Sequence, residues 1–447
     1  MHRYFPHTPD DIRQMLERCG VNALSDLYAD VPEELRLADG YRTGKPMSEQ
    51  EVREYFKALD GMNSPLTCFA GAGFYDHYTP AVIPTMLSRS EFLTAYTPYQ
   101  AEISQGTLQY IFEYQTMITE LTGLAVSNAS MYDGTTALAE SMLMTVASAR
   151  KRNRVLVSST LNPIYREVID TYAHYHGVTV DTIPATDEGV TDFSLLPDML
   201  AGGDVAGVIV ATPNFHGILE DLTGVADACH AAKALLVISS PASALGVIKS
   251  PGEWGADIAA GEAQSLGMPL SYGGPYLGYM CCTKALIRKL PGRIVGATTD
   301  ADGNRCFVLT LQAREQHIRR DKATSNICSN QGLMALHAAI YLSVMGREGL
   351  AEVNRLSCDG AHYLAAQLEA AGVASLKYKG KPFLNEFEVD LTVDADTVIE
   401  YCAGRGVLAG VKTGSRSLLI AVTEKRSRKE IDELVDLFVS LSKTSES

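Results

Sequence analysis

The 447-residue chain lacks several features that mark particular classes of protein. No apolar run approaches the ~20 residues that a membrane-spanning helix needs. The first residues, MHRYFPHTPDD, show no apolar stretch of the kind found in signal peptides. Basic side chains are in deficit, with 38 Lys and Arg against 53 Asp and Glu and a net charge of -15. We therefore expect neither nucleic acid nor a membrane surface as a partner.

Motifs for metal binding and for hydrolysis are also missing. The nine cysteines show no Cys-x-x-Cys spacing, which predicts reduced thiols and a cytoplasmic location. No Gly-x-Ser-x-Gly motif is present, so a serine hydrolase is not indicated. His174 and His176 stand at a predicted helix end without an acid or thiol at ligand spacing. We predict no metal site.

The first 60 residues carry two strong helix signals. Thr8 can cap a helix that continues through Pro9, Asp10 and Asp11 and ends near Gly20. Ser48 to Glu51 has the spacing of a capping box at the start of a second helix. The predicted first domain, 1–95, combines this helical arm with a loop rich in Tyr and Pro.

That loop begins with FAGAGFYDHYTP and has no clear period. Long ordered loops in compact proteins are often functional, but aromatic side chains also serve simply to pack a loop onto a surface. Both interpretations stay open for its phenols and imidazole. A helical pattern follows from Ser104 and ends at Gly123.

The middle of the chain alternates apolar strands with helices. Strands are predicted at 155–159, 178–183, 205–212 and 235–240, and further ones in the sequences GADIAA and YLGYMCC. Continuous apolar runs that alternate with helices are typical of a mostly parallel sheet covered on both faces. The pattern predicts a large α/β domain over 96–325. The remaining helices and short strands predict a small α+β domain over 326–447.

Three polar segments follow predicted strands, where ligands bind in such sheets. Asp133, Gly134 and Thr135 open a helix, so they form either an anion site or an ordinary cap. Asn214 could bind a ring oxygen or belong to a turn. Ser239 ends a strand.

The segment Gly255–Gly278, GADIAAGEAQSLGMPLSYGGPYLG, opens like the strand and loop that carry the cofactor lysine in a pyridoxal-phosphate (PLP) enzyme. Gln264 and Ser265 stand where that lysine is expected. Ser239 stands where such a domain needs an Asp, whose charge keeps the pyridine nitrogen protonated. The fold of a PLP domain is therefore indicated without two of its cofactor anchors.

Together, FAGAGFYDHYTP, TAYTPYQAEISQG, NASMYDGTTALAE, TPNFHGILED and the segment 255–278 resemble the glycine cleavage system P-protein family. The resemblance covers essentially the whole chain and points to the alpha, or N-terminal, subunits. It implies an α/β fold of the fold-type-I PLP-transferase kind. A large domain with a mostly parallel seven-stranded sheet would be followed by a small C-terminal α+β domain.

The resemblance also implies a function. The family is glycine dehydrogenase (aminomethyl-transferring, decarboxylating), in which a beta subunit carries the lysine and PLP and pairs with the alpha subunit as alpha2beta2. The complex decarboxylates glycine and passes the aminomethyl group to the lipoyl arm of the H-protein. This chain would bind no cofactor itself and would be inactive alone, with Ser265 at the lysine position.

Two groups of site residues follow from the resemblance. A residual cofactor pocket would comprise Asp133, Gly134, Thr135, Asn214, Ser239, Gln264 and Ser265. A wall of the shared active site would comprise Tyr75, His77, Tyr96, Thr97, Gln100, Glu102 and Gln105.

Two alternatives stay open on the residues alone. One is a non-catalytic scaffold of another PLP complex. The other is an autonomous PLP enzyme with a displaced lysine, for which Lys249 and Lys284 are nearest in sequence.

Overall fold

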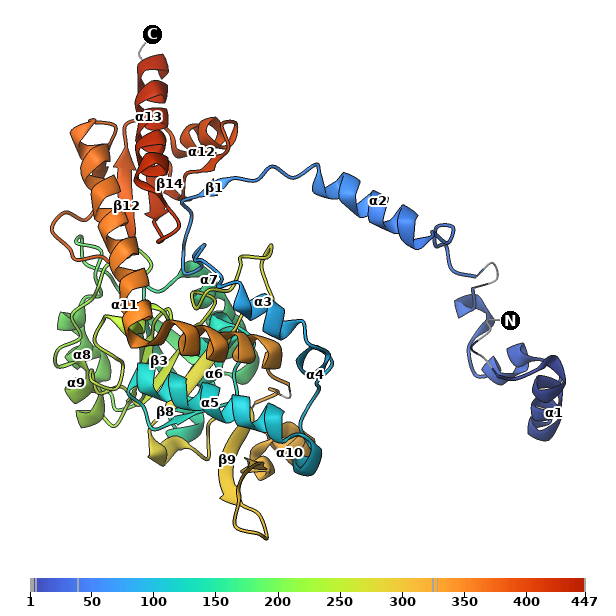
Figure 1. Cartoon of the computed structure of the whole chain (residues 1–447). Coiled ribbons are helices and arrows are strands. Elements are labelled where there is room, and N and C mark those ends of the chain that lie inside the picture. Colours follow the sequence, from blue (N-terminus) through green and yellow to red (C-terminus); the bar gives the residue numbers. More distant parts are fainter. Residues whose placement is uncertain (1–3, 5, 38–39, 324, 328, 446–447) are drawn as a thin grey trace. The chain divides into compact units, whose positions relative to one another are not determined.

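The computed structural model describes residues 4, 6–37, 40–323, 325–327 and 329–445 (Figure 1). The chain divides into two compact units, Met1–Ser64 and Pro65–Ser447. The domain boundaries expected near residues 95 and 325 stay predictions. In the described ranges, no helix combines the length and the apolar character that crossing a bilayer requires.

The N-terminal unit contains the two predicted helices, α1 (Pro9–Cys19) and α2 (Glu49–Asp60). The Thr8 hydroxyl accepts the Asp11 N–H at 3.2 Å, and Gly20 ends α1 with φ 73°. Ser48 and Glu51 form the predicted capping box of α2. Neither helix buries a residue.

The second unit is built on a seven-stranded sheet in the order β2-β8-β7-β6-β5-β3-β4. Five neighbouring strands run parallel, while β8 is antiparallel to both β7 and β2. The predicted mostly parallel sheet is confirmed. The strands are β2 (Val126–Ser127), β3 (Arg154–Ser158), β4 (Thr179–Ile183), β5 (Val205–Ala211), β6 (Leu235–Ser239), β7 (Ile258–Glu262) and β8 (Gly278–Cys282).

Helices cover both faces of this sheet, because successive side chains of each buried strand point to opposite sides. Val155 and Val157 of β3 pack into one core with α6, whereas Leu156 packs into another core with α8 and α9. The helices of this part are α5 (Gln105–Thr122), α6 (Gly134–Ser148), α7 (Pro163–His176), α8 (Leu196–Leu200) and α9 (Val225–Ala231). The carboxyl ends of the parallel strands are thus left as one edge open to loops.

A long helix, α11 (Gly332–Ala370), continues from the large sheet to a small C-terminal sheet and is interrupted by Gly346 at φ 60°. Its first half lies beside α5 (Figure 1). The small sheet is antiparallel, in the order β11-β12-β15-β14. The C-terminal part contains β11 (Ala374–Leu376), β12 (Glu386–Leu391), α12 (Ala395–Ala403), β13 (Val407–Leu408), β14 (Val411–Gly414), β15 (Ser417–Ala421) and α13 (Arg428–Ser445).

The aromatic loop is anchored to this C-terminal part. β1 (Thr67–Cys68) pairs in parallel with β13, just before the loop begins. The loop has no strand of its own and contains two short helices, α3 (Val82–Leu87) and α4 (Ser90–Leu93). The sequence pattern indicates the loop but not these two helices.

A hairpin was not predicted from the sequence. It consists of β9 (Ile294–Thr299) and β10 (Arg305–Thr310), joined by a turn at Asp300–Asn304. Short segments complete the fold: α10 (Gln316–Arg319) and 3-10 turns at 24–28, 33–35, 101–103, 193–195, 244–246, 284–286, 312–314 and 320–322.

Near the junction between the two sheets, two glycines with similar backbone angles should differ in how much stability is lost when each is replaced by alanine. Gly217 has φ 83°, and a Cβ there would lie 2.1 Å from the Glu386 carbonyl oxygen. Gly224 has nearly the same φ, 81°, but open space around it. Gly217→Ala should lower the free energy of unfolding by about 2 kcal/mol more than Gly224→Ala, because overpacking adds to the backbone strain that both share. Equal losses in urea unfolding would contradict the close contact.

Candidate cofactor pocket and aromatic loop

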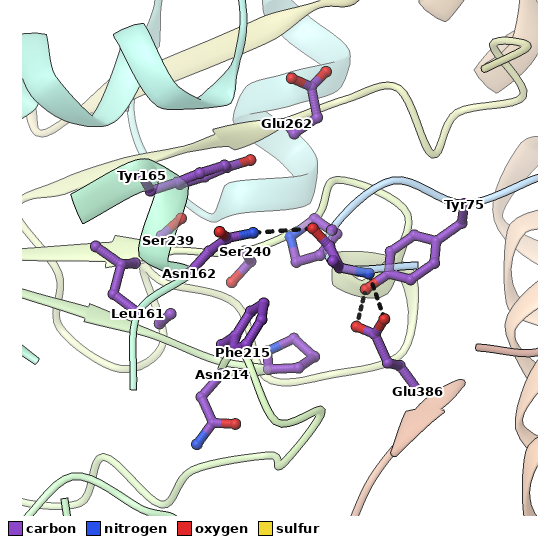
Figure 2. A pocket seen from close by; sticks show the side chains of 15 residues that line it. Tyr75, Leu161, Asn162, Tyr165, Asn214, Phe215, Ser239, Ser240, Glu262 and Glu386 are labelled. Carbon is purple, nitrogen blue, oxygen red and sulfur yellow. Dashed lines mark hydrogen bonds between the residues drawn. The ribbon is translucent and has the colours of Figure 1, made fainter. Parts of the chain in front are cut away.

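A small cleft, with a cavity volume of about 50 Å³, lies at the carboxyl ends of β5, β6 and β7 (Figure 2). Loops after these strands form one side of the cleft, and the aromatic loop and β12 form the other. Its lining residues are Ala72, Gly73, Tyr75, Leu161, Asn162, Tyr165, Ala211, Pro213, Asn214, Phe215, Ser239, Ser240, Pro241, Glu262 and Glu386. Of the seven residues predicted for the residual cofactor pocket, Asn214 and Ser239 line this cleft, and the pocket itself stays a prediction.

Gln264, at the expected lysine position, is completely buried and binds backbone. Its side-chain oxygen accepts the Tyr75 N–H at 2.9 Å, and its amide nitrogen donates to the Tyr75 carbonyl at 2.9 Å. The same nitrogen donates to the Met268 carbonyl at 2.7 Å. The residue thus pairs with the aromatic loop much as a neighbouring strand would.

Ser265 is also buried, and its hydroxyl oxygen accepts the Ser243 N–H at 3.1 Å. Ser239 is buried at the end of β6 and lines the cleft. Among the described residues that line the cleft there is no lysine. Lys249 and Lys284 are both exposed, and Lys249 lies over the Trp254 ring at 3.6 Å.

Asp133 caps α6, as the simpler of its two interpretations predicts. Its carboxylate accepts the Thr136 N–H at 2.8 Å and also binds the Thr135 hydroxyl. The Gly134 N–H donates instead to Glu262 at 2.9 Å. The N–H groups of Gly134 and Thr136 at this helix start are therefore bound by carboxylates of the chain itself.

Asn214 belongs to a turn, which is one of the two interpretations that the sequence left open. Its amide nitrogen donates to the Gly189 carbonyl at 2.8 Å and to Glu220 at 2.7 Å. Its side-chain oxygen accepts the N–H groups of His216 and Ile218 at 3.0 and 3.1 Å. All four hydrogen-bonding positions of this side chain are occupied, which leaves none for a ring oxygen.

Two residues of the predicted wall are buried between the large sheet and the C-terminal part. The Tyr75 hydroxyl donates to Glu386 at 2.9 Å, and Glu386 also accepts the Ala72 N–H at 2.5 Å (Figure 2). Burial raises the pKa of Glu386 to about 7, although these two hydrogen bonds oppose the rise. Burial and the neighbouring Glu386 carboxyl raise the pKa of Tyr75 well above its ordinary value.

His77 makes a similar contact. Its Nδ1 lies 2.6 Å from Glu424, which also accepts the Tyr78 N–H at 2.7 Å. Burial raises the pKa of Glu424, but the His77 and Tyr78 contacts outweigh it and lower the pKa below its ordinary value. Tyr75 and His77 thus lie behind the surface of this chain, and their part in a shared wall stays a prediction.

The other wall residues lie further along the loop. Tyr96 is 82% exposed, and Gln100 and Glu102 are exposed as well. Tyr96 and Thr97 line a second cleft of about 120 Å³ together with Arg293. Gln105 is held by β10, since it donates to the Phe307 carbonyl at 2.8 Å and accepts its N–H at 2.9 Å. The structure therefore brings the predicted wall residues together only in part.

Three carboxyls that organise this region, those of Glu262, Glu386 and Glu424, were not predicted from the sequence. A signal existed for two of them. Glu262 is the one charged residue in the strand IAAGE, and Glu386 alternates with apolar residues in EFEVDL. A charged residue in a buried strand needs a partner, which makes it a candidate for a structural or functional role.

The chain matches the family described as glycine cleavage system P-protein over residues 2–438. The chain belongs to this family. The resemblance stated from the sequence is thereby confirmed.

A relative from Moorella thermoacetica, named probable glycine dehydrogenase (decarboxylating) subunit 1, is 50% identical and matches 97% of this chain and 98% of its own length. A solved structure of glycine decarboxylase (P-protein) in inhibitor-bound form is 43% identical, with a TM-score of 0.90 over 98% of this chain and 99% of that one. Both confirm the predicted class, a subunit of glycine dehydrogenase (decarboxylating).

The fold extends beyond the P-proteins. Glutamate decarboxylase from Lactobacillus brevis is 13% identical, with a TM-score of 0.69 over 92% of this chain and 96% of its own. This likeness concerns the fold alone, which is that of the fold-type-I PLP enzymes. The predicted fold class is confirmed.

The raised pKa of Glu386 predicts a pH dependence of stability. The ordinary value is 4.5 and the folded value about 7, so the folded state holds this proton more tightly than the unfolded chain. The stabilisation is complete below pH 4.5 and is lost as the pH rises through about 7. The free energy of unfolding of the wild type should therefore fall between pH 4.5 and about pH 7, and less so in Glu386→Gln. The measurement is urea unfolding at several pH values. If the free energy of unfolding changed equally with pH in the wild type and in Glu386→Gln, the prediction would be contradicted.

Proposed function

We propose that this chain is the half of a two-chain P-protein that has no cofactor lysine. A beta subunit pairs with it as alpha2beta2 in the cytoplasm and carries PLP. The complex decarboxylates glycine and transfers the aminomethyl group to the lipoyl group of the H-protein. The observation that carries the proposal is that buried Gln264 and Ser265 stand at the expected lysine position, both engaged with backbone.

The remaining pocket residues support the same conclusion, because they do not fit PLP. Ser239 offers no negative charge for a pyridine nitrogen. The Gly134 N–H at the start of α6 is bound by Glu262 rather than free for a phosphate. No chemical step is therefore assigned to a cofactor in this chain.

The contribution of this chain is then a surface, for which the exposed part of the aromatic loop is the best candidate. Leu93, Tyr96, Tyr99 and Ile103 are between 56% and 82% exposed. Exposed apolar side chains gathered on one segment are typical of an interaction site. We assign Tyr96, Thr97, Gln100 and Glu102 to the wall of the partner's active site, with Tyr75, His77 and Gln105 holding the loop behind them.

The two alternatives are less well supported. An autonomous PLP enzyme would need a lysine at the cleft, and Lys249 and Lys284 are not among its lining residues. A scaffold of a different PLP complex does not account for the match of residues 2–438 to the P-protein family.

The proposal is tested by producing the chain with and without a beta subunit of the same family. Alone, the chain should be colourless and should not catalyse exchange between glycine and CO2. With the beta subunit, the exchange should appear together with bound PLP. Glycine decarboxylation by the isolated chain would overturn the proposal.

Substitution of Tyr96 tests the loop assignment. Tyr96→Ala should lower the glycine–CO2 exchange of the assembled complex by about tenfold, because it removes a side chain that shapes the shared site. The matched control is Tyr175→Ala, since Tyr175 at the end of α7 is 81% exposed. Full exchange by an intact Tyr96→Ala complex would count against a role for Tyr96.

A further inference from the structure

Glu262 binds an unusual set of backbone donors. One carboxylate oxygen accepts the Gly134 N–H at 2.9 Å. The other accepts the N–H groups of Gln264 at 2.9 Å, Leu277 at 3.1 Å and Ala263 at 3.1 Å. The Ala263 N–H is shared with the Leu277 carbonyl at 2.8 Å. A side chain only 2% exposed thus collects donors from the start of α6, the end of β7 and the approach to β8.

Such a set of donors is what an oxyanion requires. N–H groups at a helix start attract negative charge, both through direct hydrogen bonds and through the helix dipole. Here the anion belongs to the chain itself. We call the set of N–H groups that bind the Glu262 carboxylate its seat. This seat is closely packed, because a Cβ at Gly134 would lie 2.6 Å from the Tyr165 hydroxyl and 2.9 Å from the Glu262 Cβ.

The seat borders the cleft described above. Glu262 and Tyr165 both line that cleft, together with Ser239 and Asn214 (Figure 2). An external anion that bound at the Glu262 end of the cleft would therefore compete with Glu262 for the same N–H groups.

We infer that Glu262 is a built-in anion that occupies the oxyanion position of the residual pocket and excludes phosphate-bearing cofactors from this chain. The exclusion has a steric and an electrostatic part. The carboxylate fills the space beside the Gly134 N–H, and its negative charge, with that of neighbouring Asp133, repels a phosphate. The inference rests on this chain alone and does not depend on which partner carries PLP.

The protonation of Glu262 fits this role. Burial raises the pKa of the carboxyl to about 7, while the hydrogen bonds from Gly134, Leu277 and Gln264 oppose the rise. Above neutral pH the group is therefore a charged carboxylate. Removing it leaves buried N–H groups without an acceptor, which is unfavourable, so a small external anion should be drawn into the vacated seat.

The experiment compares the wild type with Glu262→Ala in phosphate-free buffer at a pH of about 8, where the carboxylate is ionised. Glu262→Ala should melt at a lower temperature, and inorganic phosphate should restore much of the loss. Phosphate should also bind the variant at least about tenfold more tightly than the wild type in calorimetry. PLP added to the variant should bind without forming a borohydride-stable adduct.

Glu386→Ala is the matched control. Glu386 is a buried carboxyl of the same cleft, but it accepts one N–H and one hydroxyl and does not lie at a helix start. Its melting temperature should fall without recovery in phosphate. Glu262→Gln should also lose stability without gaining phosphate, because the amide still fills the seat.

Three results would overturn the inference. They are equal phosphate affinity of wild type and variant, a folded Glu262→Ala that phosphate neither binds nor stabilises, and an equal recovery of the Glu386→Ala control. If Glu262→Ala is not recovered folded, Glu262→Ser gives the same comparison, and folding of either variant only in phosphate supports the inference.

Discussion

Buried backbone groups at the end of β7 must have hydrogen-bonding partners, and the local structure depends on how that requirement is met. Two nearby side chains, those of Glu262 and Gln264, supply these partners. The Glu262 carboxylate accepts N–H groups from three elements, and the Gln264 amide pairs with both backbone groups of Tyr75. In an enzyme with a bound cofactor, this is where a phosphate and a lysine would act. In this chain, Gln264 at the end of β7 joins the sheet to the aromatic loop.

Because Gln264 stands at the expected lysine position, this position helps to hold the aromatic loop. The loop is held from the sheet by Gln264, from α7 by Asn162, which donates to the Ala72 carbonyl at 2.9 Å, and from β12 by Glu386. A rigidly held loop can present its exposed portion, around Tyr96, in a fixed position. In the function that we propose for this subunit, the residual cofactor pocket would thus support the exposed surface of the loop.

Much of the fold could be predicted from the sequence. Strands such as β3 and β5 of the large sheet appear as continuous apolar runs, and the capped helices α1 and α2 begin where Thr8 and Ser48 indicate. The β9–β10 hairpin was not predicted, although the Asp300–Asn304 sequence, DADGN, is typical of a turn. Its strands are only partly buried, and their residues are mixed in polarity, so no clear alternation marks them.

The candidate site was predictable in its position but less so in its chemistry. The missing lysine can be seen in the sequence itself, since a strand and a Gly-Gly-Pro turn frame Gln264 and Ser265. The hydrogen-bonding partners of these residues cannot be seen in the sequence. Gly134 and Glu262 are 128 positions apart, and Tyr75 and Glu386 are 311 apart, so their contacts exist only once the chain has folded. The same limit explains why Tyr75 and His77 could not be recognised as buried.

The central claim is that chemistry in this P-protein requires a second polypeptide because this chain cannot hold the cofactor covalently. The most direct test is to reduce the assembled complex with borohydride and to locate the phosphopyridoxyl label by mass spectrometry of both chains. The account predicts the label on one lysine of the beta subunit and none on this chain. A label on any lysine of this chain, in a stoichiometric amount, would contradict it.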